Sequence, residues 1–350
     1  MSTPPVIRPG SIIGGRYEIL ETLGKGGMGM VYKAHDRVLD DTVAIKLLRP
    51  DVAAEPEMAR RFRSEIKLAR KVRHRNVCGI HEYGEDGGLR YISMEYIEGV
   101  DLRHALTRTG APLPAEAYEI SIQLAQGLHA IHEAGIIHRD LKTPNIMRDA
   151  KGHVRLMDFG IAKQAGEAAG PAVTALGMIV GTPEYMSPEQ ARGEKVDFRS
   201  DIYALGVVIF EIFTGQVPFR AETPIATIFK HLQEAPPIED AALPAALKPV
   251  LRRALAKSPA DRYETAADLV KALEHARSET FPSAPAKTTT PPSTLADLLA
   301  EAERMVAGGR LAEAQALLRR AVDVDPHSPV AFRRLFEVAS ALAARGEGTL

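Results

Sequence analysis

The apolar pattern of the chain changes near residue 99, and this change most restricts the folds open to it. Up to residue 94, short apolar runs alternate with turn residues and predict strands, with one helix at 57–72. Beyond that point long helices dominate, over 115–134 and 200–215. We therefore predict an α+β protein with two lobes, a small antiparallel sheet lobe with one helix and a large helical lobe. A ligand cleft is expected between them.

Composition excludes several classes of protein. The 350 residues carry a net charge of −1, which gives no general attraction to nucleic acid. Cys78 is the only cysteine, so an intrachain disulfide is excluded and a reducing compartment is favoured. The most apolar stretch, 202–213, is shorter than the ~20 residues that span a bilayer, and the N-terminus has no signal-peptide pattern. We expect a cytoplasmic protein without a membrane span.

Two polar motifs carry the chemistry: His-Arg-Asp-Leu-Lys-Thr-Pro-Asn at 138–145 and Asp-Phe-Gly at 158–160. Nine fixed positions at a set spacing arise by chance with a probability on the order of 10⁻¹². Asp140 can accept the proton of an attacking hydroxyl, and Lys142 can neutralise charge on a transferred phosphoryl group. Asn145 and Asp158 offer the oxygen ligands that Mg²⁺ prefers. This combination predicts phosphoryl transfer.

A glycine-rich segment, Gly-Lys-Gly-Gly-Met-Gly at 24–29, follows one predicted strand and runs into another. Glycines let the backbone approach phosphate oxygens, although an ordinary flexible hairpin has the same pattern. A dinucleotide site would need a helix next, whereas a strand-like segment follows here, so a flap over phosphates is favoured. Lys46 ends another predicted strand. Glu65, in the helix at 57–72, is a carboxylate that could hold its ammonium group.

Together these segments resemble the protein-kinase signature set, namely the glycine flap, V-A-I-K, H-R-D-L-K-x-x-N and D-F-G. Residues 181–189 resemble the substrate-binding loop of that family, and 201–206 its central buried helix. Arg262 resembles the arginine that pairs with the glutamate of this loop, here Glu189. The resemblance extends over about residues 17–277.

Finer features are similar to bacterial eukaryotic-like, or Hanks-type, serine/threonine kinases. Lys142 and Thr182 are typical of the serine/threonine class, and the glycine loop and residues 186–191 are similar to the bacterial branch. Thr143-Pro144 and Ser187 depart from the common pattern without removing a catalytic group. The resemblance implies ATP and Mg²⁺ as cofactors, with Mn²⁺ as an alternative, and Ser/Thr hydroxyls of proteins as acceptors.

The resemblance also assigns residues to roles. It implies that Asp140, Lys142, Lys46 and Glu65 are catalytic, and that Asn145 and Asp158 bind metal. Met94 resembles the gatekeeper residue. The implied nucleotide-binding residues are Leu23, Gly24, Lys25, Gly26, Gly27, Met28, Gly29, Met30, Val31, Ala44, Lys46, Glu95, Ile97 and Asp101.

Regulation is expected in the segment after the Asp-Phe-Gly motif. In the family, an arginine placed like Arg139 binds a phosphate carried by that segment. Thr174 and Thr182 are the only threonines between residues 160 and 187. Thr182 matches the threonine that contacts the catalytic residues. Thr174 is therefore our predicted autophosphorylation site, the alternative being an ordinary loop threonine.

The C-terminal quarter has a different composition. Residues 278–294 form a Pro/Thr/Ser-rich linker, and 295–346 are rich in Ala, Leu and Arg at helical spacing. The spacing resembles one tetratricopeptide repeat and the start of a second, while a generic helical hairpin is the alternative. We predict a tail at 1–15, a kinase domain at 16–277, the linker, and this helical segment, which could bind a partner, self-associate or pack on the kinase domain.

A pseudokinase scaffold that binds partners through the helical tail is the alternative function. Such proteins usually lack an equivalent of Lys46, Asp140 or Asp158, and all three are present here. The sequence therefore favours an active kinase.

Overall fold

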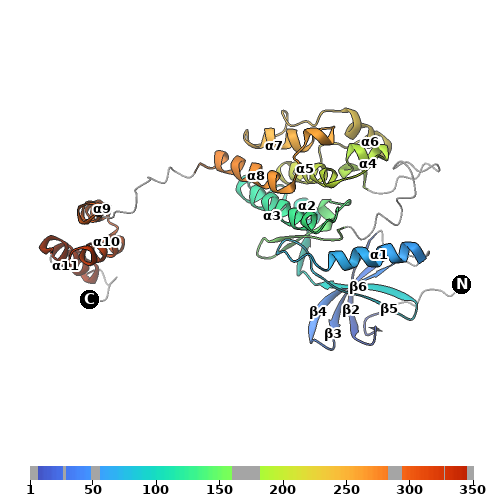
Figure 1. Ribbon diagram of the computed structural model, residues 1–350, viewed down its shortest axis with the longest axis horizontal. Coiled ribbons are helices and arrows are strands. Elements are labelled where there is room, and N and C mark those ends of the chain that lie inside the picture. The colour runs from blue at the N-terminus through green and yellow to red at the C-terminus, as the bar shows by residue number, and fades with distance from the viewer. Residues whose placement is uncertain are drawn as a thin grey trace. The chain divides into compact units, whose positions relative to one another are not determined.

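The computed structural model describes residues 7–26, 29–48, 56–159, 182–282, 294–326 and 328–344. The chain divides into two compact units, Met1–Phe281 and Pro282–Leu350. Each unit is described by itself below. The first unit has the two lobes expected from the sequence, a small sheet lobe and a larger helical lobe (Figure 1).

The small lobe is built on an antiparallel sheet with the strand order β1-β2-β3-β4-β6-β5. Helix α1 (Pro56–Ala69) lies between this sheet and the helical lobe (Figure 1). Ile66 and Ala69 of α1 are buried in the main core, as the predicted helical spacing requires. The strands are β1 (Ile12–Ile13), β2 (Tyr17–Gly26), β3 (Gly29–Asp36), β4 (Asp41–Leu48), β5 (Ile80–Asp86) and β6 (Leu89–Glu95).

The large lobe is organised around α5 (Phe198–Thr214), whose residues from Ser200 to Phe213 are all buried. A helix that is apolar on all sides needs such a central position. Helices α3 and α7 pack against it, and Gly215 ends it in the left-handed conformation with φ 76°. The other helices are α2 (Leu102–Thr109), α3 (Pro114–Glu133), α4 (Pro188–Arg192), α6 (Pro224–Gln233), α7 (Leu247–Ala254) and α8 (Ala266–Thr280).

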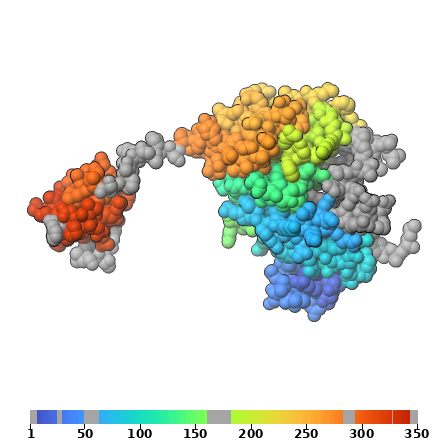
Figure 2. All heavy atoms as spheres, in the orientation of Figure 1, coloured from blue at the N-terminus to red at the C-terminus, as the bar shows by residue number. Residues whose placement is uncertain are grey.

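A second, small sheet lies where the two lobes meet, with the order β7-β8-β9. Its strands are β7 (Gly99–Asp101), β8 (Ile146–Asp149) and β9 (Val154–Leu156). The loop before β8 and the turn after β9 contain the two polar motifs. This sheet therefore holds both motifs at the base of the small lobe. In the space-filling view, the sheet lobe and the helical lobe form one continuous body (Figure 2).

A buried ion pair joins two segments of the large lobe that lie far apart along the chain. Arg262 donates to both carboxylate oxygens of Glu189, over 2.7 and 2.8 Å, which confirms the pairing expected from the sequence. Their side chains are 0% and 3% exposed. Burial opposes ionisation of Glu189, but the hydrogen bonds from Arg262 hold its pKa below the usual value. The pair ties the end of the substrate-loop motif to the segment before α8.

Helix α8 extends to Thr280, three residues into the predicted linker at 278–294. The hydroxyl of Thr280 lies 2.9 Å from that of Tyr118 on α3, and Phe281 packs edge-on against the same ring. These contacts explain why a segment of polar composition continues the helix.

The second unit consists of α9 (Leu295–Ala307), α10 (Leu311–Val324) and α11 (Pro329–Ala344). Helix α10 packs against both others, and its Ala314 and Leu318 are buried between them. The hairpin of α9 and α10 and the following helix α11 agree with the helical segments predicted over residues 295–346. Among the helices of the described residues, none combines the length and the apolar character needed to cross a membrane.

The buried ion pair leads to a stability prediction. Glu189→Gln should destabilise the first unit by about 3 kcal/mol, because Arg262 would keep its charge while losing its buried counter-ion. The exposed pair Arg277–Glu119 offers a control, in which Glu119→Gln should change the stability by less than about 1 kcal/mol. Urea unfolding of both variants measures the difference. Equal effects of the two substitutions would contradict this view of the core.

Candidate active site

A short ion pair joins the two lobes. Lys46 lies on β4, with Val31 of β3 and Ile92 of β6 as its register partners, and its side chain is 4% exposed. Its Nζ is 2.7 Å from Oδ1 of Asp158, which follows β9 in the large lobe. A lysine from the small lobe and a carboxylate from the large lobe thus meet at the lobe junction.

The backbone at Asp158 adopts an unusual conformation that its neighbour holds in place. Its φ is 57°, a value that non-glycine residues rarely take. Phe159 is 1% exposed within the main core, with its ring centroid 6.4 Å from that of His138. Because the buried ring anchors the turn, the carboxylate of Asp158 is kept at the junction rather than in solvent.

The second motif gathers polar groups around Asp140. Lys142 Nζ lies 2.9 Å from Asp140 Oδ2, and Asn145 Nδ2 donates to the same oxygen over 3.0 Å. Asn145 also donates to the backbone carbonyl of Asp140 over 2.8 Å. Lys142 further donates to Thr182 Oγ1 over 3.2 Å. The carboxylate of Asp140 therefore has a fixed orientation beside the start of the substrate-loop motif.

One backbone bond connects the two halves of the site. The N–H of Met157, next to Asp158, donates to the carbonyl of Asn145 over 2.8 Å. The groups of Lys46, Asp158, Asn145 and Asp140 thus belong to one connected network at the lobe junction.

A buried carboxylate supports this network from below. Asp201, 1% exposed at the start of α5, accepts hydrogen bonds from the backbone N–H groups of His138 and Arg139 over 2.7 and 2.8 Å. His132 Nε2 lies 2.8 Å from it. Burial alone would raise the pKa of Asp201, but its interactions with His132 and the backbone hold it below the usual value. Arg139 has a φ of 64°, so Asp201 holds a strained backbone one residue before Asp140.

The sequence places Asp201 in the motif at 201–206 but predicts no role for it. The available signal was a carboxylate at the start of an otherwise apolar, buried helix, since a buried charge requires partners. What the sequence did not contain was the identity of these partners, which come from a loop more than 60 residues earlier.

The glycine flap and the apolar residues above the junction lie on the first strands. Gly24 pairs with Val31 and Gly26 with Gly29 between β2 and β3. A Cβ at Gly29 would lie 1.7 Å from the carbonyl oxygen of Leu47, so β4 approaches too closely for any other residue. Lys25 and Met30 pair beside them. Leu23 is 45% exposed on β2, and Gly27 and Met28 lie outside the described residues, as does Thr174.

The segment that joins the lobes contains the remaining predicted nucleotide residues. Ala44 and Met94, both 4% exposed, are register partners on β4 and β6. Glu95 ends β6 and donates its N–H to the carbonyl of Gly79 over 2.8 Å, while Ile97 is buried. Asp101 caps α2 by accepting from the N–H of His104 over 2.8 Å.

The contact of Lys46 that the structure shows is the one with Asp158. The sequence predicted Glu65 as the carboxylate that holds the ammonium group of Lys46, and that contact stays a prediction. Glu65 lies on α1, which packs on the sheet through the neighbouring Ile66. Spacing along the chain predicted a helix at this place but could not fix its distance from β4.

Comparison with known proteins identifies the family. Residues 17–285 match the protein kinase domain family, which is more than half of the chain. The chain belongs to the protein kinase family. As implied by the resemblance, its relatives are bacterial serine/threonine kinases.

Two relatives illustrate this. Serine/threonine-protein kinase PknB of Mycobacterium tuberculosis (strain ATCC 25618 / H37Rv) is 40% identical over 317 residues, which cover 89% of this chain and 49% of PknB. Serine/threonine-protein kinase PrkC of Bacillus subtilis (strain 168) is 41% identical over 263 residues, covering 74% of this chain and 40% of PrkC. The chain thus spans about half the length of the curated relatives it matches, or less.

Solved structures agree with the bilobal kinase fold. The kinase domain of Mycobacterium tuberculosis PknI is 31% identical with a TM-score of 0.62, covering 77% of this chain and 99% of that chain. Rad53 1–466 in complex with AMP-PNP is 27% identical with a TM-score of 0.61, covering 75% of this chain and 65% of that chain.

Protein kinases use ATP and a divalent cation, and the kinase site here has suitable ligands. No group of three or more His, Cys, Asp or Glu side chains that could hold a metal occurs within the described ranges. A kinase site does not need one, because Mg²⁺ takes one or two protein ligands together with phosphate oxygens and water. Asp158 and Asn145, joined through the Met157–Asn145 backbone bond, fit this pattern.

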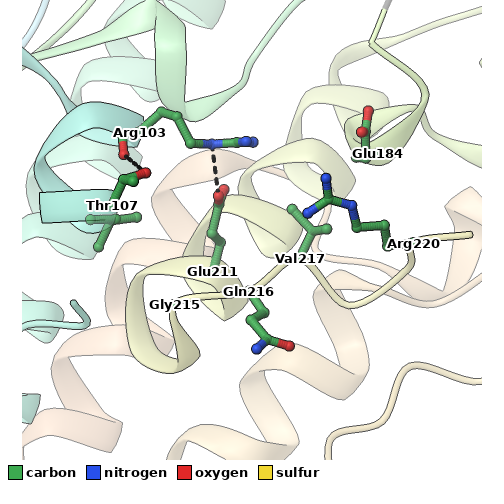
Figure 3. Close-up of a pocket in the computed structure, with 9 residues that line it drawn as sticks. Arg103, Thr107, Glu184, Glu211, Gly215, Gln216, Val217 and Arg220 are labelled. Atoms are coloured by element: carbon green, nitrogen blue, oxygen red, sulfur yellow. Dashed lines mark hydrogen bonds and ion pairs between the residues drawn. The ribbon is translucent and has the colours of Figure 1, made fainter.

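The segment at 182–185 is tied to the large lobe by a further network, of which Figure 3 shows the part around Glu211. Tyr185, in the 3-10 turn Pro183–Tyr185, donates to Glu211 Oε2 over 2.6 Å and lies 2.9 Å from Thr143 Oγ1. Arg103 from α2 reaches Glu211 Oε1 over 3.1 Å, as Figure 3 shows. Burial raises the pKa of Glu211 above its usual value. Beside this network lies a pocket of about 350 Å³, bordered also by Glu184 and Arg220. Sequence reasoning did not identify this network.

The support of the catalytic loop by Asp201 is testable through stability. Asp201→Ala should cost about 3 kcal/mol, because it leaves buried donors of His138, Arg139 and His132 without their acceptor. Asp201→Asn keeps an acceptor oxygen and should cost less, about 1–2 kcal/mol. Thermal and urea unfolding measure both. Asp197→Ala is the control at the same helix start, where loss of an N-cap costs about 1 kcal/mol. If Asp201→Ala cost no more than Asp197→Ala, the supporting role would be refuted.

Proposed function

We propose that the chain is an active protein serine/threonine kinase, which transfers the γ-phosphoryl group of Mg²⁺-bound ATP to Ser or Thr hydroxyls of proteins. The observation that carries the proposal is the connected network of Lys46, Asp158, Asn145 and Asp140. Every group that phosphoryl transfer requires from the protein is present there, in contrast to the usual pseudokinase.

Asp140 is proposed to orient the attacking hydroxyl and accept its proton. Its carboxylate is held by Lys142 and Asn145, which limits its rotation and points it at one position. Lys142 also contacts Thr182, so its ammonium group lies between the proton acceptor and the substrate loop. A cation in that place stabilises negative charge on the transferred group.

Asp158 and Asn145 are proposed to hold the divalent cation, for which Mg²⁺ is preferred and Mn²⁺ is an alternative. The bound cation would neutralise the charge of the phosphates. Lys46 is proposed to contact phosphate oxygens, since its ammonium group is nearly buried and already faces the cation-binding carboxylate. Glu65 is proposed to orient Lys46 in the active arrangement of the lobes.

The nucleotide is proposed to lie beneath the glycine flap. Val31 and Ala44 face the core side of β3 and β4, and with Leu23 they would cover the adenine ring. The Glu95 carbonyl and the Ile97 amide would bind the edge of the ring, and Asp101 the ribose. Flap residues 24–30 would cover the phosphates. The serine/threonine preference is supported by Lys142 and Thr182 and by the names of the relatives.

A cytoplasmic location stays a prediction from the sequence. Thr174 is proposed as an activating autophosphorylation site, whose phosphate would bind Arg139. Arg139 lies next to Asp140, and its carbonyl accepts from Gln190 Nε2 over 3.2 Å. A phosphate bound there would act directly on the catalytic loop.

The role of Asp140 has a direct test. Asp140→Asn should lower kcat by about 10²–10⁴-fold, because the amide cannot accept the proton, while the Kd for ATP changes little. Phosphate incorporation into a generic basic protein with Mg²⁺ measures kcat, and calorimetric titration with ATP measures the Kd for ATP. Asp268→Asn, at an exposed helix start, is the control and should leave both unchanged. Undiminished turnover in Asp140→Asn would refute the proposal.

The cation site has a separate test. EDTA should abolish phosphate transfer and added Mg²⁺ should restore it, because the cation proposed to bind Asp158 and Asn145 supplies the positive charge that neutralises the phosphates. Asp158→Asn should raise the Mg²⁺ concentration needed for half-maximal rate by about tenfold or more. A Mg²⁺ dependence equal to that of the unmodified chain would exclude Asp158 as a ligand.

Regulation through Thr174 predicts a pattern among variants. Thr174→Ala should lower turnover by about tenfold, the value of one lost charge-assisted hydrogen bond. Thr174→Ser keeps a hydroxyl that can be phosphorylated and should stay active. Phosphatase-treated protein should match Thr174→Ala. Full activity of dephosphorylated protein would show that this threonine is not a switch.

A further inference from the structure

Helix α11 in the second unit exposes two aromatic side chains on one face. Phe332 and Phe336 are 50% and 70% exposed, and they lie four residues apart, so they project from adjacent turns of the same side. A different side of the helix is buried: Val338 and Leu342 are 5% and 2% exposed against α10. Helix α11 therefore has two apolar faces, and one of them is open.

An open aromatic stripe of this kind is unusual in a folded unit. Single exposed apolar residues are common, but two phenylalanines side by side form a contiguous patch, which typically marks an interaction surface. Aromatic residues also contribute most of the energy in protein interfaces.

The charges beside the stripe indicate what covers it. Arg333 and Glu337 lie on one flank of the stripe, again four residues apart, and both are exposed. Glu337 pairs with Arg334 over 2.9 Å, whereas Arg333 forms no ion pair within the part of the chain that the structure describes. Along the helix, this flank therefore carries a positive group, Arg333, followed one turn later by a negative group, Glu337. When two helices pair in antiparallel fashion, the same flank of each faces that of the other. A surface with this order of charges is therefore complementary to itself.

We propose that the stripe of Phe332 and Phe336 binds a second copy of this chain, as an antiparallel pair of α11 helices. A twofold axis beside residue 334 would place Phe332 opposite the partner's Phe336, and the reverse, so that four aromatic rings interleave. Arg333 would then lie about 3 Å along the axis from the partner's Glu337, because two residues of helix rise separate them. The contact occurs twice, as a twofold interface requires.

The evidence for this pairing does not depend on the proposed kinase function. Dimer formation would nevertheless affect kinase activity. It would join two catalytic units through their linkers and raise their effective concentration toward each other. The interface is small, so we expect a dissociation constant on the order of 10 μM.

Sedimentation equilibrium of the full chain, from about 1 to 300 μM, tests the proposal. The mass should rise from one chain toward two. Phe336→Glu should weaken the pairing at least about tenfold, because it puts a charge into the aromatic cluster. Val324→Ser, which changes an apolar residue on α10 that is 52% exposed, should leave the pairing unchanged. Circular dichroism checks that each variant keeps its helices.

A charge exchange separates specific pairing from general stickiness. Arg333→Glu alone should weaken the dimer, because it places like charges opposite each other twice, and Arg333→Glu with Glu337→Arg should restore it to within a few-fold. A chain that stays monomeric over the whole range would overturn the proposal. A dimer that persists in Phe336→Glu would also overturn the proposal, because the interface would then lie elsewhere. A charge exchange that fails to restore the dimer would overturn it too.

Discussion

The hydrogen bonds that Asp201 accepts from the catalytic loop are the interaction on which the active site depends. Asp201 lies in the buried helix α5, and its carboxylate binds the backbone N–H groups of His138 and Arg139, so the loop is fixed to the centre of the large lobe. A loop that carries chemistry gains precision from such an anchor. Arg139 has positive φ, and the conformational energy this costs is offset by the charged acceptor Asp201, which is buried from solvent.

From this anchor, the geometry of the site extends outward in two steps. Asp140 and Asn145 follow directly on the anchored loop, and the bond from Met157 to Asn145 aligns the strand that leads to Asp158. The pair Lys46–Asp158 then connects the large lobe to the sheet of the small lobe. The site is therefore a chain of contacts that begins in a core helix and ends on a strand of the other lobe.

Much of this arrangement could be predicted from the sequence, because its chemistry depends on rare residue combinations. The two polar motifs predicted the function, and the pairing of Arg262 with Glu189 was predicted correctly across more than 70 positions. Other features depend on distances in space, which no local pattern encodes. The partner of Lys46, the donors around Asp201 and the network of Tyr185, Arg103 and Glu211 each join segments far apart along the chain. The open face of α11 likewise depends on contacts in space, because it is defined by which other face of the helix packs against α10.

One metal-bound nucleotide is proposed to lie among Lys46, Asp140, Asn145 and Asp158. A crystal structure of the chain with Mg²⁺ and a non-hydrolysable ATP analogue would test this arrangement. We expect a cation about 2.1 Å from oxygens of Asp158 and Asn145, with the terminal phosphates between Lys46 and Asp140. A nucleotide bound away from these four residues, or a cation held by other ligands, would contradict it.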